Sequence, residues 1–153
     1  MGVKDELKAA LTAAMKARDE VALSALRQAL SAVSVAETAG SELVELGDDQ
    51  VLAVLAAEAK KHHEAADAFE RAGRVEQVAS ERAEAAVLEA YLPAALSDDE
   101  LQAIVADEVA AAAADGATGM KAMGRVVNAV RARAGQSADG ARIAALVKAA
   151  LSA

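Results

Sequence analysis

Residues 48–73 read DDQVLAVLAAEAKKHHEAADAFERAG and decide how this chain folds. An unbroken seam recurs through the stretch at spacings of three and four residues, the period of one face of an α-helix. The seam consists of Leu52, Leu55, Ala59, His62, Ala66 and Phe69. Asp48 is placed to cap the first amides, and Gly73 has the position of a glycine that ends a helix. The stretch therefore predicts one long helix with a buried face.

The same spacing extends in both directions from this helix and predicts an all-α fold without strands. The expected helices are Val3–Ala17, Glu20–Ala39, one from Val75 to about Leu92, one from Ser97 to about Asp115, one from Thr118 to Gly135, and one after Gly140. The composition agrees, since 55% of the residues are hydrophobic but there is one Phe, one Tyr, no Trp and one Pro. Alanine makes up most of the hydrophobic residues, and it is the best helix former.

A domain boundary is predicted at residues 92–97. Pro93 disfavours helical geometry at Leu92, so the fourth helix ends there. Ser97 and Glu100 have the spacing of a capping box, in which each side chain takes a free amide of the new helix. We therefore expect an N-terminal helical domain of about four helices at 1–92 and a C-terminal domain of three helices at 97–153.

Composition excludes several classes of protein. The chain has no cysteine, so disulfides, zinc–thiolate sites and cysteine nucleophiles are ruled out. The first residues lack the apolar segment of a signal peptide, and no apolar run is long enough to span a bilayer. We expect a soluble cytoplasmic protein with no membrane partner and no cofactor.

Charge is distributed unevenly along the chain. The net charge is −8, but residues 117–153 hold six basic residues and one acidic residue, Asp139. Lys121, Arg125 and Asn128 fall within about 60° of one another on a regular helix, opposite a stripe formed by Met120, Met123, Val127 and Val130. Gly124 would allow a close backbone approach. The candidate RNA-contacting residues are Lys121, Gly124, Arg125, Asn128, Arg131, Arg133 and Arg142; the alternative is a merely solvated basic surface.

An ordered series of short motifs resembles the GatB/YqeY family. The series is Glu58-Ala59-Lys60-Lys61, Phe69-Glu70-Arg71-Ala72-Gly73-Arg74, Glu89-Ala90-Tyr91-Leu92-Pro93, Met120-Lys121-Ala122-Met123-Gly124-Arg125 and Ala138-Asp139-Gly140. The order is similar to that of free-standing YqeY-like proteins. Residues 97–153 also resemble the C-terminal domain of the GatB subunit of aminoacyl-tRNA amidotransferase, which implies a tail that engages tRNA. Many relatives have a basic residue before Ala-Asp-Gly, whereas this chain has Gln136-Ser137.

No catalytic centre is expected in the chain itself. It has no Walker loop, dinucleotide fingerprint or nucleophile elbow. His63 and Asp67 share a helical face but lack a third ligand, and His62 lies on the seam, so no metal site is expected.

The leading hypothesis is a tRNA-associated accessory protein that contacts tRNA or a tRNA-processing complex, with a possible protein partner for the acidic N-terminal part. The alternatives are a helical protein-interaction adaptor without RNA contact, and a component of a carbon–nitrogen ligase with glutamine as amido-N-donor.

Overall fold

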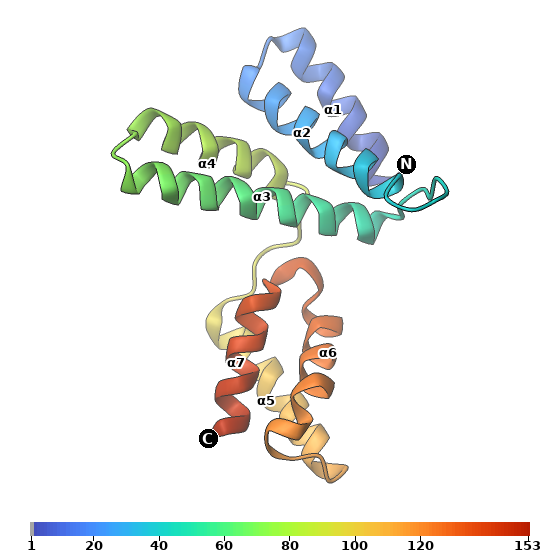
Figure 1. The fold of residues 1–153 in the computed structure, drawn as a ribbon, viewed down its shortest axis with the longest axis vertical. Coiled ribbons are helices and arrows are strands. Elements are labelled where there is room, and N and C mark those ends of the chain that lie inside the picture. Colours follow the sequence, from blue (N-terminus) through green and yellow to red (C-terminus); the bar gives the residue numbers. More distant parts are fainter. Residues whose placement is uncertain (1) are drawn as a thin grey trace. The chain divides into compact units, whose positions relative to one another are not determined.

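The computed structural model describes residues 2–153 and contains seven α-helices and two short 3₁₀ turns in that range, with no strand (Figure 1). The elements are α1 (Val3–Ala17), α2 (Glu20–Glu37), α3 (Asp48–Arg71), α4 (Val75–Glu89), α5 (Asp98–Ala114), η1 (Gly119–Ala122), α6 (Met123–Ala134), η2 (Gly135–Ser137) and α7 (Gly140–Ser152). The all-α prediction is confirmed. Helix α2 ends slightly earlier than expected, and the 3₁₀ turns at η1 and η2 were not predicted.

The chain divides into two compact units between Pro93 and Ala94. We call residues 2–93 the N-terminal unit and residues 94–153 the C-terminal unit, and describe each by itself.

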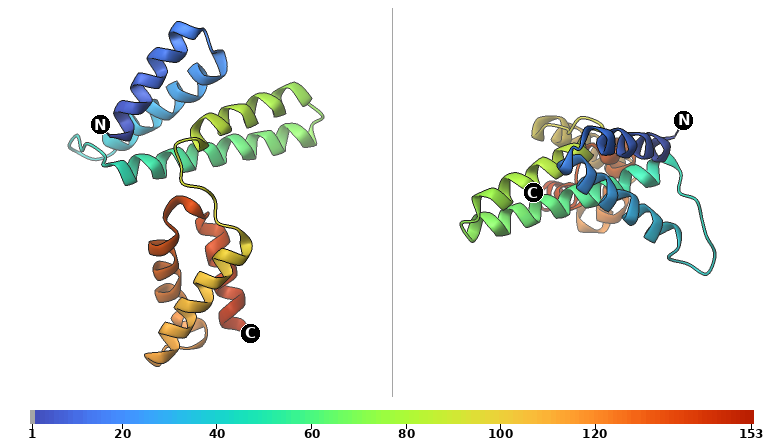
Figure 2. Two further views of the ribbon diagram at one scale, coloured as in Figure 1. Left: turned by 180° about the vertical axis from the view of Figure 1, so that it is seen from behind. Right: turned by 90° about the horizontal axis from the view of Figure 1, so that it is seen from above.

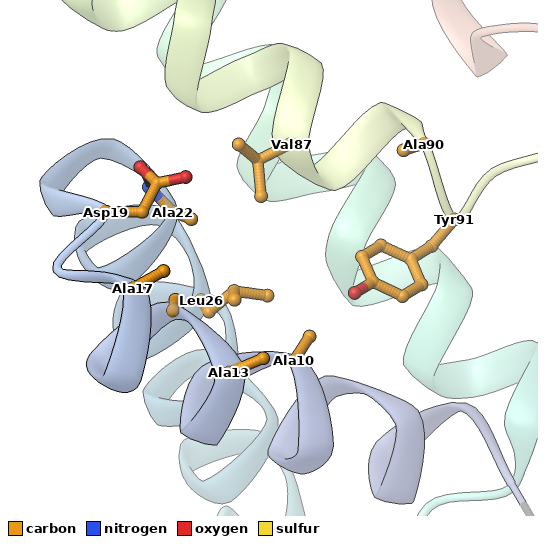
Figure 3. Close-up of a pocket in the computed structure, with 10 residues that line it drawn as sticks. Ala10, Ala13, Ala17, Asp19, Ala22, Leu26, Val87, Ala90 and Tyr91 are labelled. Atoms are coloured by element: carbon orange, nitrogen blue, oxygen red, sulfur yellow. Dashed lines mark hydrogen bonds between the residues drawn. The ribbon is translucent and has the colours of Figure 1, made fainter.

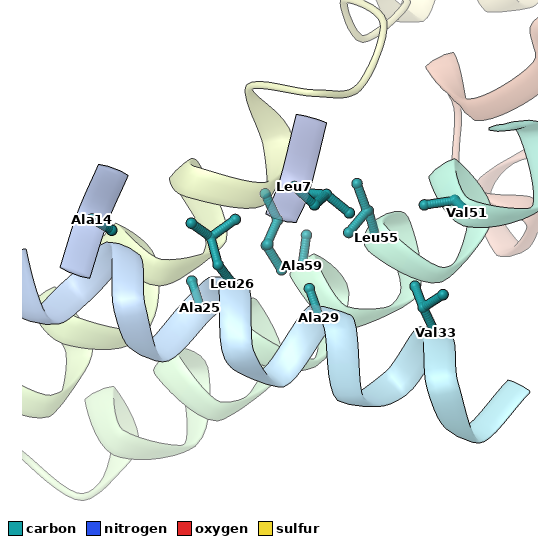
Figure 4. Packing of buried hydrophobic residues seen from close by; sticks show 10 residues of the cluster. Leu7, Ala14, Ala25, Leu26, Ala29, Val33, Val51, Leu55 and Ala59 are labelled. Atoms are coloured by element: carbon teal, nitrogen blue, oxygen red, sulfur yellow. The ribbon is translucent and has the colours of Figure 1, made fainter. Parts of the chain in front are cut away.

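The N-terminal unit consists of two helical hairpins, α1–α2 and α3–α4 (Figures 1 and 2). Its core is built mostly from leucine, valine and alanine, with Leu7, Leu26, Leu55 and Leu88 fully buried (Figure 4). Each buried leucine contributes about 1.5–3 kcal/mol relative to exposure. The smaller Ala25 and Ala29, both fully buried, let the helix backbones approach closely.

The α3–α4 hairpin extends beyond the hairpin that covers it, and its tip at Gly73 projects away from α1 and α2 (Figures 1 and 2). The hydrophobic cluster of this unit reaches Ala59 on α3 and Leu88 on α4. Farther toward the tip, the fully buried side chains are alanines, Ala66 and Ala85. Two helices that face each other through alanine bury little apolar surface, so polar contacts gain weight there.

Glu37, at the end of α2, ties the start of the N-terminal unit together. Its carboxylate is buried and accepts hydrogen bonds from Lys4 Nζ at 2.7 and 2.9 Å and from the Leu46 amide at 3.0 Å. One acidic side chain therefore links α1, the end of α2 and the loop that leads into α3.

The predicted cap of α3 by Asp48 is wrong. Asp48 Oδ1 instead accepts from the Val3 amide at 3.0 Å and so caps α1. At α3, Gln50 Oε1 accepts from the Gly47 amide at 2.9 Å. Asp48 is already inside the first turn of α3, and its side chain is free to serve the neighbouring helix.

We expect Glu37→Gln to remove an acid-sensitive part of the stability. The hydrogen bonds from Lys4 and Leu46 hold the pKa of Glu37 below its ordinary value. A depressed pKa stabilises the fold above the unfolded-state pKa, and this stabilisation disappears as pH falls through the folded-state pKa. Melting temperature measured against pH by circular dichroism should fall more steeply with acid for the natural chain than for Glu37→Gln. Glu42→Gln, at an exposed position, should retain the natural profile; an unchanged profile in Glu37→Gln would contradict this account.

The C-terminal unit packs α5, α6 and α7 around one core. Leu101, Val126, Val130, Ile143 and Val147 are at most 1% exposed. They belong to a hydrophobic cluster that draws on all three helices.

The N-terminal end of the C-terminal unit is fixed by polar contacts. The Leu96 amide donates to the Ser137 carbonyl at 2.8 Å, and its own carbonyl accepts from Arg142 at 3.2 Å. Ser97 Oγ accepts from the Glu100 amide at 3.1 Å, which is the Ser97 half of the expected capping box. Leu96 thus lies inside the unit, and the independent folding of residues 97–153 stays a prediction.

Ser97→Ala should destabilise the C-terminal unit by about 1 kcal/mol, because the Glu100 amide loses its side-chain acceptor. Urea unfolding followed by circular dichroism would measure this loss. Ser80→Ala is the matched control, since Ser80 is exposed within α4 and caps no helix end. Equal effects of the two substitutions would show that the Ser97 hydroxyl does not act as a cap.

No helix within residues 2–153 is long and apolar enough to cross a membrane.

Candidate nucleic-acid interface

The register of α6 differs in part from the prediction. The expected apolar stripe of Met120, Met123, Val127 and Val130 is right in part: Val130 is buried and Val127 packs against the core, but Met120 is 48% exposed. The buried positions are Ala122, Val126, Val130 and Ala134. The segment Gly119–Ala122 forms a 3₁₀ turn, which advances about 120° per residue rather than 100°. Angles computed for one continuous helix therefore do not relate Lys121 to Arg125.

Three of the candidate cations are paired with acids of the same unit. Arg125 bonds Asp115 just after α5, and Arg142 bonds Asp98 at the start of α5. Arg133 lies 3.3 Å from Asp107 and 3.2 Å from Glu108. These two carboxylates raise the pKa of Arg133 further above its usual value. The three arginines therefore link α6 and α7 to acids in or just after α5 through largely exposed ion pairs, which contribute little stability but reduce the free positive charge.

The net charge of the C-terminal unit differs from that of residues 117–153 alone. The expectation of a basic C-terminal end counted residues from 117 onward, but the compact unit also includes α5. Residues 94–153 hold six basic and seven acidic residues, a net charge of −1 (6 − 7). A basic surface on this unit is therefore local.

Three of the predicted side chains are exposed and unpaired. The side chains of Lys121, Asn128 and Arg131 make no hydrogen bond or ion pair within residues 2–153, and Gly124 has open space above its α-carbon. Arg131 is exposed, with its guanidinium close over Gly140 at the start of α7. An added Cβ at Gly140 would lie 2.8 Å from Arg131 Nη2, so the glycine makes room for that side chain.

Lys148 is a further exposed cation of this unit that was not among the predicted residues. Ser152 Oγ on α7 lies 3.5 Å from Met120 Sδ, which places the last turns of α7 beside η1. Lys148 precedes Ser152 by four residues and so lies on the same face of α7. It is exposed and unpaired within the described residues, like Lys121. Lys148 thus lies on a helix that packs against η1, the turn that carries Lys121, and recognising this required the α7–η1 packing.

The histidines on α3 have partners on α4. His63 and Asp67, weighed as a ligand pair, are both contacted by Arg82, at 3.1 Å from His63 Nδ1 and 2.8 Å from Asp67 Oδ1. His63 Nε2 also contacts Glu89. An arginine therefore occupies the space between the two side chains, and this geometry does not favour a metal there.

A groove of about 490 Å³ lies within the N-terminal unit beside the end of α4 (Figure 3). Alanines of α1, Leu26, Val87 and Tyr91 line most of it, with Asp19 at one end. Burial, and then the Glu6 carboxylate, raise the pKa of Tyr91, so the phenol stays neutral. Tyr91 packs against the hydrophobic cluster of this unit.

A second groove of about 740 Å³ runs between α2 and α3. Val35, Ala36 and Val54 contribute apolar surface, and Arg27, Glu58 and Lys61 contribute charge. Val35 is 65% exposed, and in the loop after α2 Leu43 and Val44 are 75% and 59% exposed. These are unusually exposed apolar side chains for a chain with so few large ones.

The fold defines a class of small all-helical proteins built from two compact helical units. A protein-family model described as Yqey-like protein matches residues 4–151. The chain belongs to this family. No curated protein matches it.

Proposed function

We propose that this protein is a tRNA-associated accessory factor whose C-terminal unit contacts RNA phosphates through Lys121, Lys148 and nearby polar groups. The observation that carries the proposal is the pair of exposed, unpaired lysines beside the η1–α7 contact. Lysine side chains contact phosphate as mobile point charges and need no preformed bidentate geometry. The family membership and the resemblance of residues 97–153 to the GatB tail support this assignment.

The arrangement favours a small contact over a broad electrostatic surface. Arg125, Arg133 and Arg142 are partly neutralised by their acidic partners. Asn128 and the open backbone at Gly124 add neutral contacts to the nearby sugar–phosphate chain. Each phosphate contact releases condensed counterions, so few contacts imply weak binding with a shallow dependence on salt.

Binding of the full chain to tRNA should weaken with salt along a log–log slope of roughly −1.5 to −3, as two to four phosphate contacts require. Lys121→Glu combined with Lys148→Glu should reduce the magnitude of this slope by about 2, one per lysine. Fluorescence anisotropy of labelled tRNA over a salt series would measure both slopes.

The matched control is Arg71→Glu with Arg74→Glu, which changes the charge equally in the N-terminal unit. Both arginines are exposed and unpaired within the described residues. We expect this control to retain most of the slope. Absence of salt-dependent binding near physiological ionic strength would exclude the RNA proposal, and equal effects of the two double variants would reduce it to general charge attraction.

A second candidate is a helical adaptor for another protein, favoured by the groove between α2 and α3 with its exposed Val35, and by the exposed Leu43 and Val44 in the loop after α2. The N-terminal unit holds 10 basic and 17 acidic residues, a net charge of −7 (10 − 17), so a basic partner is the better fit. If the protein shows no salt-dependent binding to tRNA, the adaptor role becomes the favoured function.

Neither role requires a catalytic centre in this chain, and glutamine-dependent ligation belongs to it only as part of a larger assembly. The purified protein should release no glutamate from glutamine, because it has neither a cysteine nor a Gly-x-Ser-x-Gly elbow to supply a nucleophile. A coupled glutamate assay would measure this. Turnover that a point substitution in this chain abolishes would contradict the proposal.

A further inference from the structure

His62 on α3 lies inside a compact group of ligand atoms that the proposed function does not use. Its Nδ1 is 2.6 Å from Glu81 Oε2 and 3.5 Å from Glu84 Oε2, both on α4. One ligand atom from each of these three residues lies within 4.8 Å of the others. The local sequence around His62 shows no third ligand, because both carboxylates come from the next helix.

The group is poorly neutralised by its own side chains. The His62 side chain is 6% exposed, that of Glu84 12% and that of Glu81 25%. The polar partners shown for the two carboxylates are His62 and Gln28, which donates to Glu84 at 3.3 Å. Two half-buried carboxylates thus share one imidazole, and bringing charge out of water is costly without full compensation.

A histidine at this position is itself costly. The seam residues on either side of His62 are Ala59 and Ala66, and an apolar side chain would continue the packing. His62 Nε2 is instead buried with no hydrogen-bond partner within the described residues. Buried polar atoms without partners are rare and call for an explanation. Nε2 itself stays without a partner, so the interactions of the other ring nitrogen, Nδ1, which faces the two carboxylates, must offset the cost of placing a histidine here.

We propose that His62, Glu81 and Glu84 form a zinc site that joins α3 to α4. An imidazole nitrogen with two carboxylate oxygens suits a borderline divalent ion, whereas Mg²⁺ and Ca²⁺ favour all-oxygen sets. Tetrahedral zinc with bonds of about 2.1 Å separates its ligand atoms by about 3.4 Å. The His62–Glu84 separation of 3.5 Å fits, and Glu81 moves outward by less than about 1 Å from its present 2.6 Å.

The surroundings complete a zinc site. Gln28 on α2 donates to Glu84 and orients it, as hydrogen bonds to metal-ligating carboxylates do. A fourth coordination position remains for water, reached past the quarter-exposed Glu81. The metal would join the two helices where the hydrophobic cluster gives way to alanine and the hairpin loses the cover of α1.

The test uses the full chain without an affinity tag, treated with a chelator and titrated with zinc chloride by isothermal calorimetry. We expect one equivalent to bind and the melting temperature to rise. Cobalt(II), which reports its coordination through visible absorption, should give a spectrum that zinc displaces. His62→Gln should abolish both signals, and Gln28→Ala should lower zinc affinity by about tenfold or more.

His63→Gln is the matched control, since His63 is the neighbouring histidine on α3 and pairs with Arg82 and Glu89. It should retain one tight equivalent. If circular dichroism shows that His62→Gln fails to fold, Glu81→Gln takes its place as the test variant, because it replaces a partly exposed ligand. It should likewise weaken zinc binding. Absence of zinc binding by the natural chain, or equal losses in the His62 and His63 variants, would overturn the site and leave His62 as an ion-paired core residue.

Discussion

Small side chains limit how much apolar surface any two helices of this protein can bury, and the positions of its polar contacts follow from that limit. Where α1 and α2 cover α3, leucines such as Leu7 and Leu55 form a conventional core. Toward the tip of the α3–α4 hairpin the buried residues are alanines, and each adds little transfer free energy. The polar contacts that His62 and His63 of α3 make with α4, and that Arg82 of α4 makes with α3, lie along this hairpin. Electrostatic and hydrogen-bonding groups thus take over where apolar area runs out.

Polar contacts also join the secondary-structure elements, at a cost in desolvation that their partners offset. Glu37 costs desolvation when it is buried, and Lys4 and the Leu46 amide offset that cost. In the C-terminal unit Arg142 reaches both the Leu96 carbonyl and Asp98. Such contacts are directional, so they determine the register of helices whose alanine faces would pack equally well in several positions. Their value lies in specificity as much as in stability.

Much of the fold follows from the sequence because alanine abundance and three–four spacing are local signals. Helices α1 and α4 begin at the predicted residues, and the α3 seam is buried at Leu55, Ala59, His62 and Ala66. The predictions fail where a residue distant in the sequence determines the local contact. Asp48 caps α1 because folding brings Val3 beside it. Met120 is exposed, against the prediction, in a 3₁₀ turn that has no strong signature in the sequence and begins at Gly119, with a φ of +65°.

The candidate site shows the same division between local and non-local information. Exposure of Lys121, Asn128 and Arg131 was predictable from their polarity, but the neutralisation of Arg125 and Arg133 by acids of α5 was not. A count of charge along the chain treats residues 117–153 as basic, whereas the fold places them against an acidic helix. What remains available to an anionic partner is therefore determined by which cations α5 leaves unpaired. That number is small, so the proposed RNA contact would rely on shape and neutral contacts around Lys121 and Lys148 more than on attraction at a distance.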